Sequence, residues 1–190
     1  MNKIALFGTS ADPPTAAHQT IISWLGDNYD RVLVWASDNP FKCHQTSLKQ
    51  REAMLRLLIE DIDPPKSNIG VYPELSHTRT WNTIEQVQET WAEAELTLVV
   101  GSDLILQLPR WYLAAKLLKE VNLLIVPRPG NPIREDALAK LKEMGARVAI
   151  APSFTPDVSS TAYRKFQDTE ALTTTVKDYI DREQLYICHN

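Results

Sequence analysis

The stretch that decides the fold is residues 3–18, Lys3-Ile4-Ala5-Leu6-Phe7-Gly8-Thr9-Ser10-Ala11-Asp12-Pro13-Pro14-Thr15-Ala16-Ala17-His18. It reads as an apolar strand, a short Gly/Thr/Ser turn, a pair of prolines, and a histidine in the first turn of a helix. Where a strand leads into a helix N-terminus, free backbone N–H groups and the positive end of the helix dipole meet. Such a point attracts phosphate, and a histidine there is placed to donate a hydrogen bond to it. The stretch therefore predicts nucleotide phosphate chemistry.

The rest of the chain alternates short apolar runs with longer helical patterns. The predicted strands are 3–7, 31–36, 69–72, 96–100, 123–126 and 148–151. The predicted helices are 16–25, 48–61, 80–92, 110–119, 134–144, 160–166 and 174–183. This alternation predicts an α/β fold, a Rossmann-like doubly wound parallel sheet with helices on both faces. The expected strand order is 3-2-1-4-5, with room for a sixth strand at the edge.

Glycines directly follow the first and fourth predicted strands, at Gly8 and Gly101. In a sheet of this order those strands are neighbours, and ligands bind in the crevice beyond their carboxyl ends. Glycines also end many strands for purely local reasons, so it is the pair at this switch point that favours a binding site. Neither GxGxxG nor GxxxxGK[ST] occurs, which removes the usual support for dinucleotide redox or P-loop chemistry.

Size and composition indicate a single globular domain over residues 1–190. The net charge of −4 argues against a nucleic-acid binder that depends on a broad basic face. No apolar run is long enough to cross a bilayer, and no secretory signal precedes the first strand. Cys43 and Cys188 are isolated, which indicates neither a zinc site nor a disulfide framework. We expect a cytoplasmic protein with no nucleic-acid or membrane partner.

A second informative segment, Val158-Ser159-Ser160-Thr161-Ala162-Tyr163-Arg164, lies near the C-terminus. It has a structural interpretation, in which the hydroxyls cap a helix and Arg164 is an ordinary surface side chain. It also has a functional one, in which hydroxyls and N–H groups at a helix start hold a phosphate chain that Arg164 neutralises. The segment alone does not decide between them.

Together, residues 8–18 and 158–164 resemble the two signature segments of the HxGH-type nucleotidyltransferase superfamily. Within it the chain most resembles the nicotinate-nucleotide (nicotinamide-nucleotide) adenylyltransferases, over almost its whole length. Further matching segments stand in the same order along the chain: Asp38-Asn39-Pro40-Phe41-Lys42, Arg51-Glu52-Ala53-Met54-Leu55, Thr80-Trp81-Asn82-Thr83-Ile84, Gly101-Ser102-Asp103-Leu104, Leu108-Pro109-Arg110-Trp111 and Pro127-Arg128-Pro129-Gly130.

The chain departs from the family pattern Gly-Gly-Thr-Phe-Asp-Pro-Val-His-x-Gly-His at several positions. Thr9 replaces the second glycine, Ala11 the phenylalanine, Thr15 the first histidine and Ala17 the last glycine. Elsewhere, Phe41 stands where a loop histidine is usual and Asn82 where an aspartate is usual. Phosphopantetheine adenylyltransferases of the same superfamily carry threonine at the position of Thr15.

The resemblance implies transfer of AMP from ATP to the 5′-phosphate of nicotinate or nicotinamide mononucleotide, releasing pyrophosphate, a step of NAD biosynthesis. It implies catalytic roles for His18, Thr15, Lys42 and Arg164. The implied ATP-binding residues are Gly8, Thr9, Ser10, His18, Gly101, Asp103, Ser159, Ser160, Thr161 and Arg164. The implied mononucleotide-binding residues are Lys42, Thr80, Asn82, Thr83, Trp111 and Arg128. Mg²⁺ is expected to arrive with ATP, and no protein metal site is predicted.

Within the predicted domain, a C-terminal helical part at about 158–190 carries the Val158–Arg164 motif. All of these roles require His18 and Arg164, far apart in the chain, to face one shared site. Two alternatives stay open: adenylyl transfer to another acceptor such as phosphopantetheine, and a nucleotide-binding relative without catalysis. The altered Thr9, Ala11, Thr15 and Ala17 favour the second alternative. A homo-oligomer is also left open.

Overall fold

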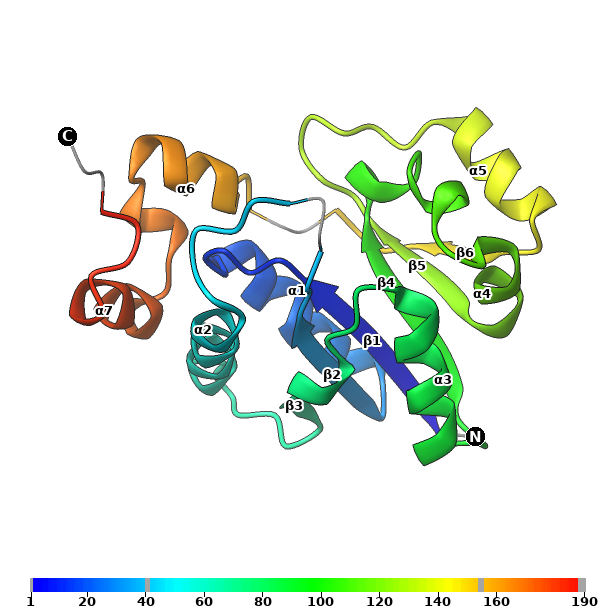
Figure 1. The fold of residues 1–190 in the computed structure, drawn as a ribbon, viewed down its shortest axis with the longest axis horizontal. Coiled ribbons are helices and arrows are strands. Elements are labelled where there is room, and N and C mark those ends of the chain that lie inside the picture. The colour runs from blue at the N-terminus through cyan, green and yellow to red at the C-terminus, as the bar shows by residue number, and fades with distance from the viewer. Residues whose placement is uncertain (1, 40–41, 154–155, 188–190) are drawn as a thin grey trace.

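The computed structural model describes residues 2–39, 42–153 and 156–187. Its centre is a six-stranded parallel sheet in the order β3-β2-β1-β4-β5-β6 (Figure 1). The strands are β1 (Lys3–Thr9), β2 (Arg31–Ala36), β3 (Ile69–Val71), β4 (Glu95–Gly101), β5 (Asn122–Val126) and β6 (Arg147–Ile150). The predicted order 3-2-1-4-5 is confirmed, and the sixth strand pairs with β5 at the edge. Pro40 and Phe41 belong to the predicted loop of residues 38–42 that ends in Lys42, here called the lysine loop. These two residues and Cys188 lie outside the described residues.

Helices cover both faces of the sheet, as predicted for a doubly wound fold. They are α1 (Ala16–Asn28), α2 (Leu48–Glu60), α3 (Thr80–Thr90), α4 (Ala114–Glu120), α5 (Glu135–Glu143), α6 (Ser160–Phe166) and α7 (Thr174–Arg182). The buried residues of α3, α4 and α5 form one core cluster, and those of α1, α2, α6 and α7 form the other. Figure 1 shows α6 and α7, drawn in orange and red, at the same end of the molecule as α2.

The central strand β1 divides these two clusters by simple alternation. Ile4 and Leu6 point into the cluster under α3–α5, whereas Ala5 and Phe7 point into the cluster under α1 and α2. All four are buried. A parallel strand covered on both faces is apolar throughout, because each successive side chain enters a core. The unbroken apolar run at the start of the chain therefore belongs at the middle of the sheet.

One predicted helix differs from the structure. Residues 110–119 were expected to be helical, but Leu108–Arg110 form a short 3-10 turn and α4 begins only at Ala114. Leu113 separates them with φ of 52°, in the left-handed region that no α-helix contains. Pro109 favours the tight turn because its ring fixes φ at the start of a helical segment. The segment after β4 is consequently a chain of short turns, which include Ser102–Leu104.

No helix within the part of the chain that the structure describes has the length and apolar character needed to cross a membrane.

Candidate functional site at the carboxyl ends of β1 and β4

The site forms where β1 and β4, neighbours in the sheet, reach their carboxyl ends. Each strand carries a glycine there that a larger residue could not replace without movement. A Cβ on Gly101 would lie 2.3 Å from Oδ1 of Asp103 and 2.7 Å from Nε of Arg128. A Cβ on Gly8 would lie 2.5 Å from the Trp35 ring. Gly101 thus allows polar side chains to crowd the strand end, whereas Gly8 makes room for a core tryptophan.

His18 lies in the first turn of α1, as predicted, and its imidazole is buried, with 6% of the residue exposed. The backbone N–H of Thr15 donates to Nδ1 at 3.1 Å, so Nδ1 is an acceptor. The other ring nitrogen, Nε2, lies 2.9 Å from Oγ1 of Thr9. Burial, together with the nearby positive charge of Arg128, lowers the pKa of His18 to about 3. The imidazole is therefore neutral at ordinary pH, and we assign its hydrogen to Nε2.

Thr15 does not face open space. The residue is completely buried, and its Oγ1 lies 2.9 Å from Nδ1 of His18. The Thr15 hydroxyl and N–H therefore both contact the same ring nitrogen. This arrangement fixes the orientation and tautomer of the imidazole, as a carboxylate or carbonyl partner does for many functional histidines.

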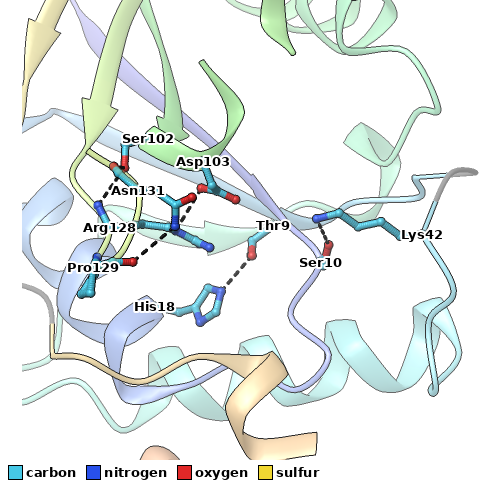
Figure 2. A network of polar contacts seen from close by, with 9 residues as sticks. All are labelled: Thr9, Ser10, His18, Lys42, Ser102, Asp103, Arg128, Pro129 and Asn131. Carbon is cyan, nitrogen blue, oxygen red and sulfur yellow. Dashed lines mark hydrogen bonds and ion pairs between the residues drawn. The ribbon is translucent and has the colours of Figure 1, made fainter. Parts of the chain in front are cut away.

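Three cationic side chains lie around the turn after β1. The Lys42 ammonium donates to Oγ of Ser10 at 3.3 Å, and Nε of Arg128 lies 3.4 Å from Oδ1 of Asp103 (Figure 2). Desolvation lowers the pKa of Lys42, and the charges of Arg128 and Arg164 lower it further, while Asp103 opposes them. Because both arginines lower the pKa of Lys42, positive charge is concentrated in this part of the molecule. Such a concentration suits an anionic ligand.

The arginine of this group is held by the loop that follows β5. Ser102 accepts the Arg128 backbone N–H at 2.9 Å and donates to the Asn131 carbonyl at 2.7 Å (Figure 2). Oδ1 of Asp103 is buried and accepts no hydrogen bond from the residues that the structure describes; its neighbour is the Arg128 guanidinium. A cavity of about 140 Å³ opens beside this pair, lined by Ser102, Asp103, Ile105, Leu106, Gly130, Asn131, Pro132 and Arg134.

The start of α6 contacts the same turn from the opposite end of the sequence. Ser159 caps the helix by accepting the Ala162 N–H at 3.1 Å. Ser160 donates to the Pro13 carbonyl at 2.7 Å, and Arg164 donates to the Asp12 carbonyl. The second η-nitrogen of Arg164 lies 3.4 Å from Oγ1 of Thr161. The structure therefore brings the two predicted signature segments together, because His18 and Arg164 both bond to the stretch 9–15, which leads from the end of β1 to the start of α1.

The predicted mononucleotide-binding residues on α3 and after β4 differ in how accessible their side chains are. Asn82 is exposed and Thr80 is half-buried, so both are accessible at the start of α3. Thr83 is buried and its hydroxyl donates to the Leu75 carbonyl at 2.9 Å, which occupies it within the fold. Trp111 is half-buried and packs against the core cluster under α3–α5. These residues lie at the helix start and turns that follow β3 and β4, respectively.

Sequence reasoning missed Asp12 as a structural centre of the site. Its carboxylate accepts from the Gln45 N–H at 2.8 Å, the Thr46 hydroxyl at 2.7 Å and the Tyr186 hydroxyl at 2.6 Å. Burial opposes ionisation of Asp12, but these hydrogen bonds outweigh it and lower its pKa. Partners 33 to 174 positions away leave no local signal in the sequence.

Arg51 was also missed as a residue that shapes the site. It is 2% exposed, and one η-nitrogen donates to the carbonyls of Ser10 and Ser37, each at 2.9 Å. It thereby links the turns that follow β1 and β2. A signal did exist, because Arg51 lies three and four positions before Met54 and Leu55, on the buried stripe of α2. A charged residue on such a stripe needs buried partners.

Among the residues that the structure describes, no three His, Cys, Asp or Glu side chains gather in a way that could hold a metal ion. The site is thus built from cations, hydroxyls and one neutral imidazole, with Asp103 as the carboxylate beside Arg128. This donor set favours binding of a polyphosphate over direct binding of a metal.

Comparison with known proteins places the chain in a family. A family model described as cytidylyltransferase-like matches residues 6–166. A probable nicotinate-nucleotide adenylyltransferase of Synechocystis sp. is 42% identical over 197 residues, covering 97% of this chain and 98% of the relative. Another, of Bacteroides thetaiotaomicron, is 28% identical and covers 87% of this chain and 82% of the relative.

Solved structures show the same fold. Plasmodium falciparum nicotinic acid mononucleotide adenylyltransferase complexed with NaAD superimposes with a TM-score of 0.83 at 23% identity, covering 98% of both chains. A putative nicotinate-nucleotide adenylyltransferase of Vibrio parahaemolyticus superimposes with a TM-score of 0.70 at 21% identity, covering 98% of this chain and 96% of that one. From the matched family model and the relative of 42% identity, the chain belongs to the cytidylyltransferase-like family, as a relative of the nicotinate-nucleotide adenylyltransferases.

Proposed function

We propose that the protein transfers AMP from ATP to the 5′-phosphate of nicotinate mononucleotide and releases pyrophosphate. The observation that carries this proposal is the meeting of His18 and Arg164 at the turn after β1, with Lys42 beside it at Ser10. Its relatives are named as nicotinate-nucleotide adenylyltransferases, which supports the choice of this reaction and of nicotinate mononucleotide over the nicotinamide form.

The reaction needs no nucleophile from the protein. An oxygen of the mononucleotide phosphate forms a bond to the α-phosphorus of ATP, and the bond from that phosphorus to the leaving pyrophosphate breaks. Positioning and stabilisation of negative charge then account for catalysis. A ring of fixed cations and hydrogen-bond donors is suited to this task, because it needs no reorganisation when charge moves.

In this proposal the phosphates of ATP lie over the turn after β1. His18 is a neutral hydrogen-bond donor whose Nε2 faces Thr9 and whose ring is held in place by Thr15. Lys42 and Arg164 neutralise the departing phosphates; Arg164 uses one η-nitrogen on Asp12, and its guanidinium has further N–H groups to offer. The remaining proposed ATP contacts are Gly8, Thr9, Ser10, Gly101, Asp103, Ser159, Ser160 and Thr161.

The mononucleotide is proposed to lie along the start of α3 and the turns after β4, where Trp111 offers an aromatic face to the pyridine ring. Arg128 would meet its phosphate, and Thr80 and Asn82 would contact its polar groups. Thr83 would act by shaping the pocket, since its hydroxyl is already bonded to Leu75.

Mg²⁺ fits this site as a partner of the triphosphate. Asp103, whose Oδ1 lies beside Arg128 and accepts no hydrogen bond from the described residues, is the carboxylate best placed to meet such an ion or its bound water. When bound, the ion would neutralise phosphate charge. Most of its ligands would come from ATP and water, because the described residues offer no cluster of metal-binding side chains.

We also propose that residues 1–190 act as one domain, with the C-terminal helical part belonging to the site. α7 packs beside α2, and Tyr186 bonds to Asp12 across 174 positions of sequence. Separating that part from the sheet would remove Arg164 and the third partner of Asp12 together.

A second candidate, a nucleotide binder without catalysis, is favoured by one specific observation. Nε2 of His18, the donor that would serve the phosphate, already points to Oγ1 of Thr9. If Thr9 only keeps Nε2 of His18 away from the phosphate, the protein would bind ATP without transferring AMP to any acceptor.

The deciding experiment measures pyrophosphate release with ATP, Mg²⁺ and one acceptor at a time: nicotinate mononucleotide, nicotinamide mononucleotide or phosphopantetheine. We expect turnover with nicotinate mononucleotide above the other two. The His18→Ala variant should lose about 10²-fold or more in kcat while remaining folded by circular dichroism. ATP binding by calorimetry without pyrophosphate from any acceptor would establish the second candidate instead.

A further inference from the structure

Thr9 occupies the position between the imidazole and the cations. It is the last residue of β1, and only 8% of it is exposed. Its carbonyl accepts the Ser37 N–H at 2.7 Å, so its backbone is fixed by the sheet and by the turn after β2. Figure 2 shows the Thr9 hydroxyl directed at His18, with Arg128 and Asp103 on one side and Ser10 and Lys42 on the other.

The direction of the bond between Thr9 and His18 follows from the other ring nitrogen. A backbone N–H can only donate, so the Thr15 N–H requires Nδ1 to be an acceptor. The neutral ring then carries its hydrogen on Nε2 and donates it to Oγ1 of Thr9 at 2.9 Å. The Thr9 hydroxyl keeps its own hydrogen, and among the described residues it has no second hydrogen-bond partner.

A hydroxyl that accepts one hydrogen bond becomes a better donor of another, because the two bonds polarise the same O–H group. The Thr9 hydrogen therefore belongs to a donor strengthened by His18, in a site that also contains Arg128 and Lys42 (Figure 2). A buried imidazole that reaches the site only through this hydroxyl has no direct contact with a ligand in the described conformation.

We propose that Thr9 is a catalytic residue, whose hydroxyl donates to an oxygen of the α-phosphoryl group while it accepts from Nε2 of His18. The inference rests on the proposed adenylyl transfer. No proton is transferred in this step. The hydrogen bonds from His18 to Thr9 and from Thr9 to the phosphoryl oxygen both shorten as negative charge grows on that oxygen. His18 is then a positioning residue that acts through Thr9, and Thr15 fixes His18 in turn.

The test replaces the hydroxyl without changing the shape of the side chain. Thr9→Val should lower kcat about 10²-fold, the usual loss when one transition-state donor is removed, and raise the KM for ATP about tenfold or less. Thr9→Ser restores the hydroxyl and should return kcat to within about threefold of the wild type. A Thr9→Val variant with wild-type kcat, or equal losses in Thr9→Val and Thr9→Ser, would overturn the assignment.

A double-mutant cycle separates this relay from independent contributions. If His18 acts through Thr9, then Thr9→Val combined with His18→Ala should be no slower than the slower single variant, within about threefold. Losses that multiply in the double variant would show that each group serves the substrate separately, which contradicts the relay.

Thr97→Val is the matched control, because Thr97 is also a buried threonine, on the neighbouring strand β4 and outside the site. It should keep wild-type kcat, KM and pH profile, whatever it does to Tm. A purely structural role for Thr9 would leave kcat and KM in Thr9→Val at their wild-type values, as in Thr97→Val, whatever the two substitutions do to Tm.

A binding measurement does not depend on turnover. It therefore tests the role of Thr9 even if the proposed adenylyl transfer is wrong. Calorimetry with an ATP analogue that has a methylene between the α- and β-phosphorus atoms reports contact with the phosphates directly. Thr9→Val should weaken its binding about tenfold, as expected for the loss of a hydrogen bond to a charged group, and Thr97→Val should not. Unchanged affinity in Thr9→Val would overturn the proposal even if the wild type proves inactive.

Discussion

His18 illustrates how burial selects the chemical state of a residue. Its imidazole is surrounded by protein and lies near Arg128, which together hold the pKa at about 3. A protonated ring there would be an uncompensated buried charge, which costs several kcal/mol. The residue therefore contributes a fixed, neutral hydrogen-bond donor, and its tautomer is set by the Thr15 N–H.

The same shift predicts how stability depends on pH. Because the pKa of His18 in the folded protein lies below its ordinary value of 6.5, the unfolded chain binds the proton more readily between about pH 6.5 and pH 3. His18 therefore weakens the folded state as the pH falls through this window, and the effect is absent above it. From pH 7 to pH 5 the loss is about 2 kcal/mol.

Urea unfolding of the wild type and of His18→Gln at pH 7 and pH 5 measures this difference. Glutamine does not titrate, so the fall in unfolding free energy between the two pH values should be about 2 kcal/mol smaller in the variant. Equal falls in both proteins would mean that His18 is protonated in the folded state at pH 5.

Some single residues could be predicted and others could not. His18 and Arg164 lie in the two segments that carry the family resemblance, so a shared site was expected for both. The contact between Thr9 and His18 depends on the rotation of two side chains, which no spacing in the sequence encodes. The resemblance implied a catalytic role for Thr15, but it gave no sign that the Thr15 N–H and hydroxyl both contact the imidazole of His18.

At the scale of elements, the turn of residues 10–13 connects most parts of the site. Its carbonyls accept from Arg51 on α2 and from Ser160 and Arg164 on α6. Its one carboxylate, Asp12, binds the segment 45–46 and the Tyr186 hydroxyl. The lysine loop and the α6 motif are therefore positioned against each other through this one turn.

Tyr186→Phe tests how strongly that turn depends on its most distant partner. Removing the hydroxyl leaves Asp12 with two donors and should lower the unfolding free energy at pH 7 by about 1–2 kcal/mol. The lost hydrogen bond favoured the carboxylate, so the pKa of Asp12 in the folded variant should rise toward its ordinary value, and the part of the acid-induced loss of stability that comes from Asp12 should become smaller than in the wild type.

Chemical denaturation across pH 3–7 measures both effects. Tyr179→Phe is the control, because it removes a hydroxyl from α7 that does not bond to Asp12. The prediction fails if the two phenylalanine variants follow the same stability–pH curve.

Elements were predicted well where one physical rule dominated. The strands appeared as apolar runs because both of their faces are covered, and α6 began where Ser159 offers a cap. The predicted start of α4 was wrong. Pro109 favours a short 3-10 turn and Leu113 has a left-handed backbone, so residues 108–113 form separate turns although their apolar spacing is helical. The hydrogen bonds of the 10–13 turn join residues far apart in sequence, so no local pattern could have revealed them.

At the scale of the molecule, stability should depend on the middle of the sheet. Leu6 on β1 is completely buried, whereas Leu106 in the turns after β4 is 57% exposed. Leu6→Ala should lower the unfolding free energy by about 2–5 kcal/mol, because it removes apolar contacts and leaves a cavity. Leu106→Ala should change it by about 0.5 kcal/mol or less. Urea titrations of both variants give the comparison, and similar losses would contradict this assignment of the core.

The strand order has a consequence for how the chain is made. β1 is synthesised first and lies inside the sheet, and every later strand joins an edge that already exists: β2 and β3 on one side, then β4, β5 and β6 on the other. A nascent polypeptide leaving the ribosome can thus extend its sheet outward by simple accretion, with no strand inserted between two others. The segments that complete the candidate site, from Ser160 to Tyr186, emerge only after these six strands have been synthesised.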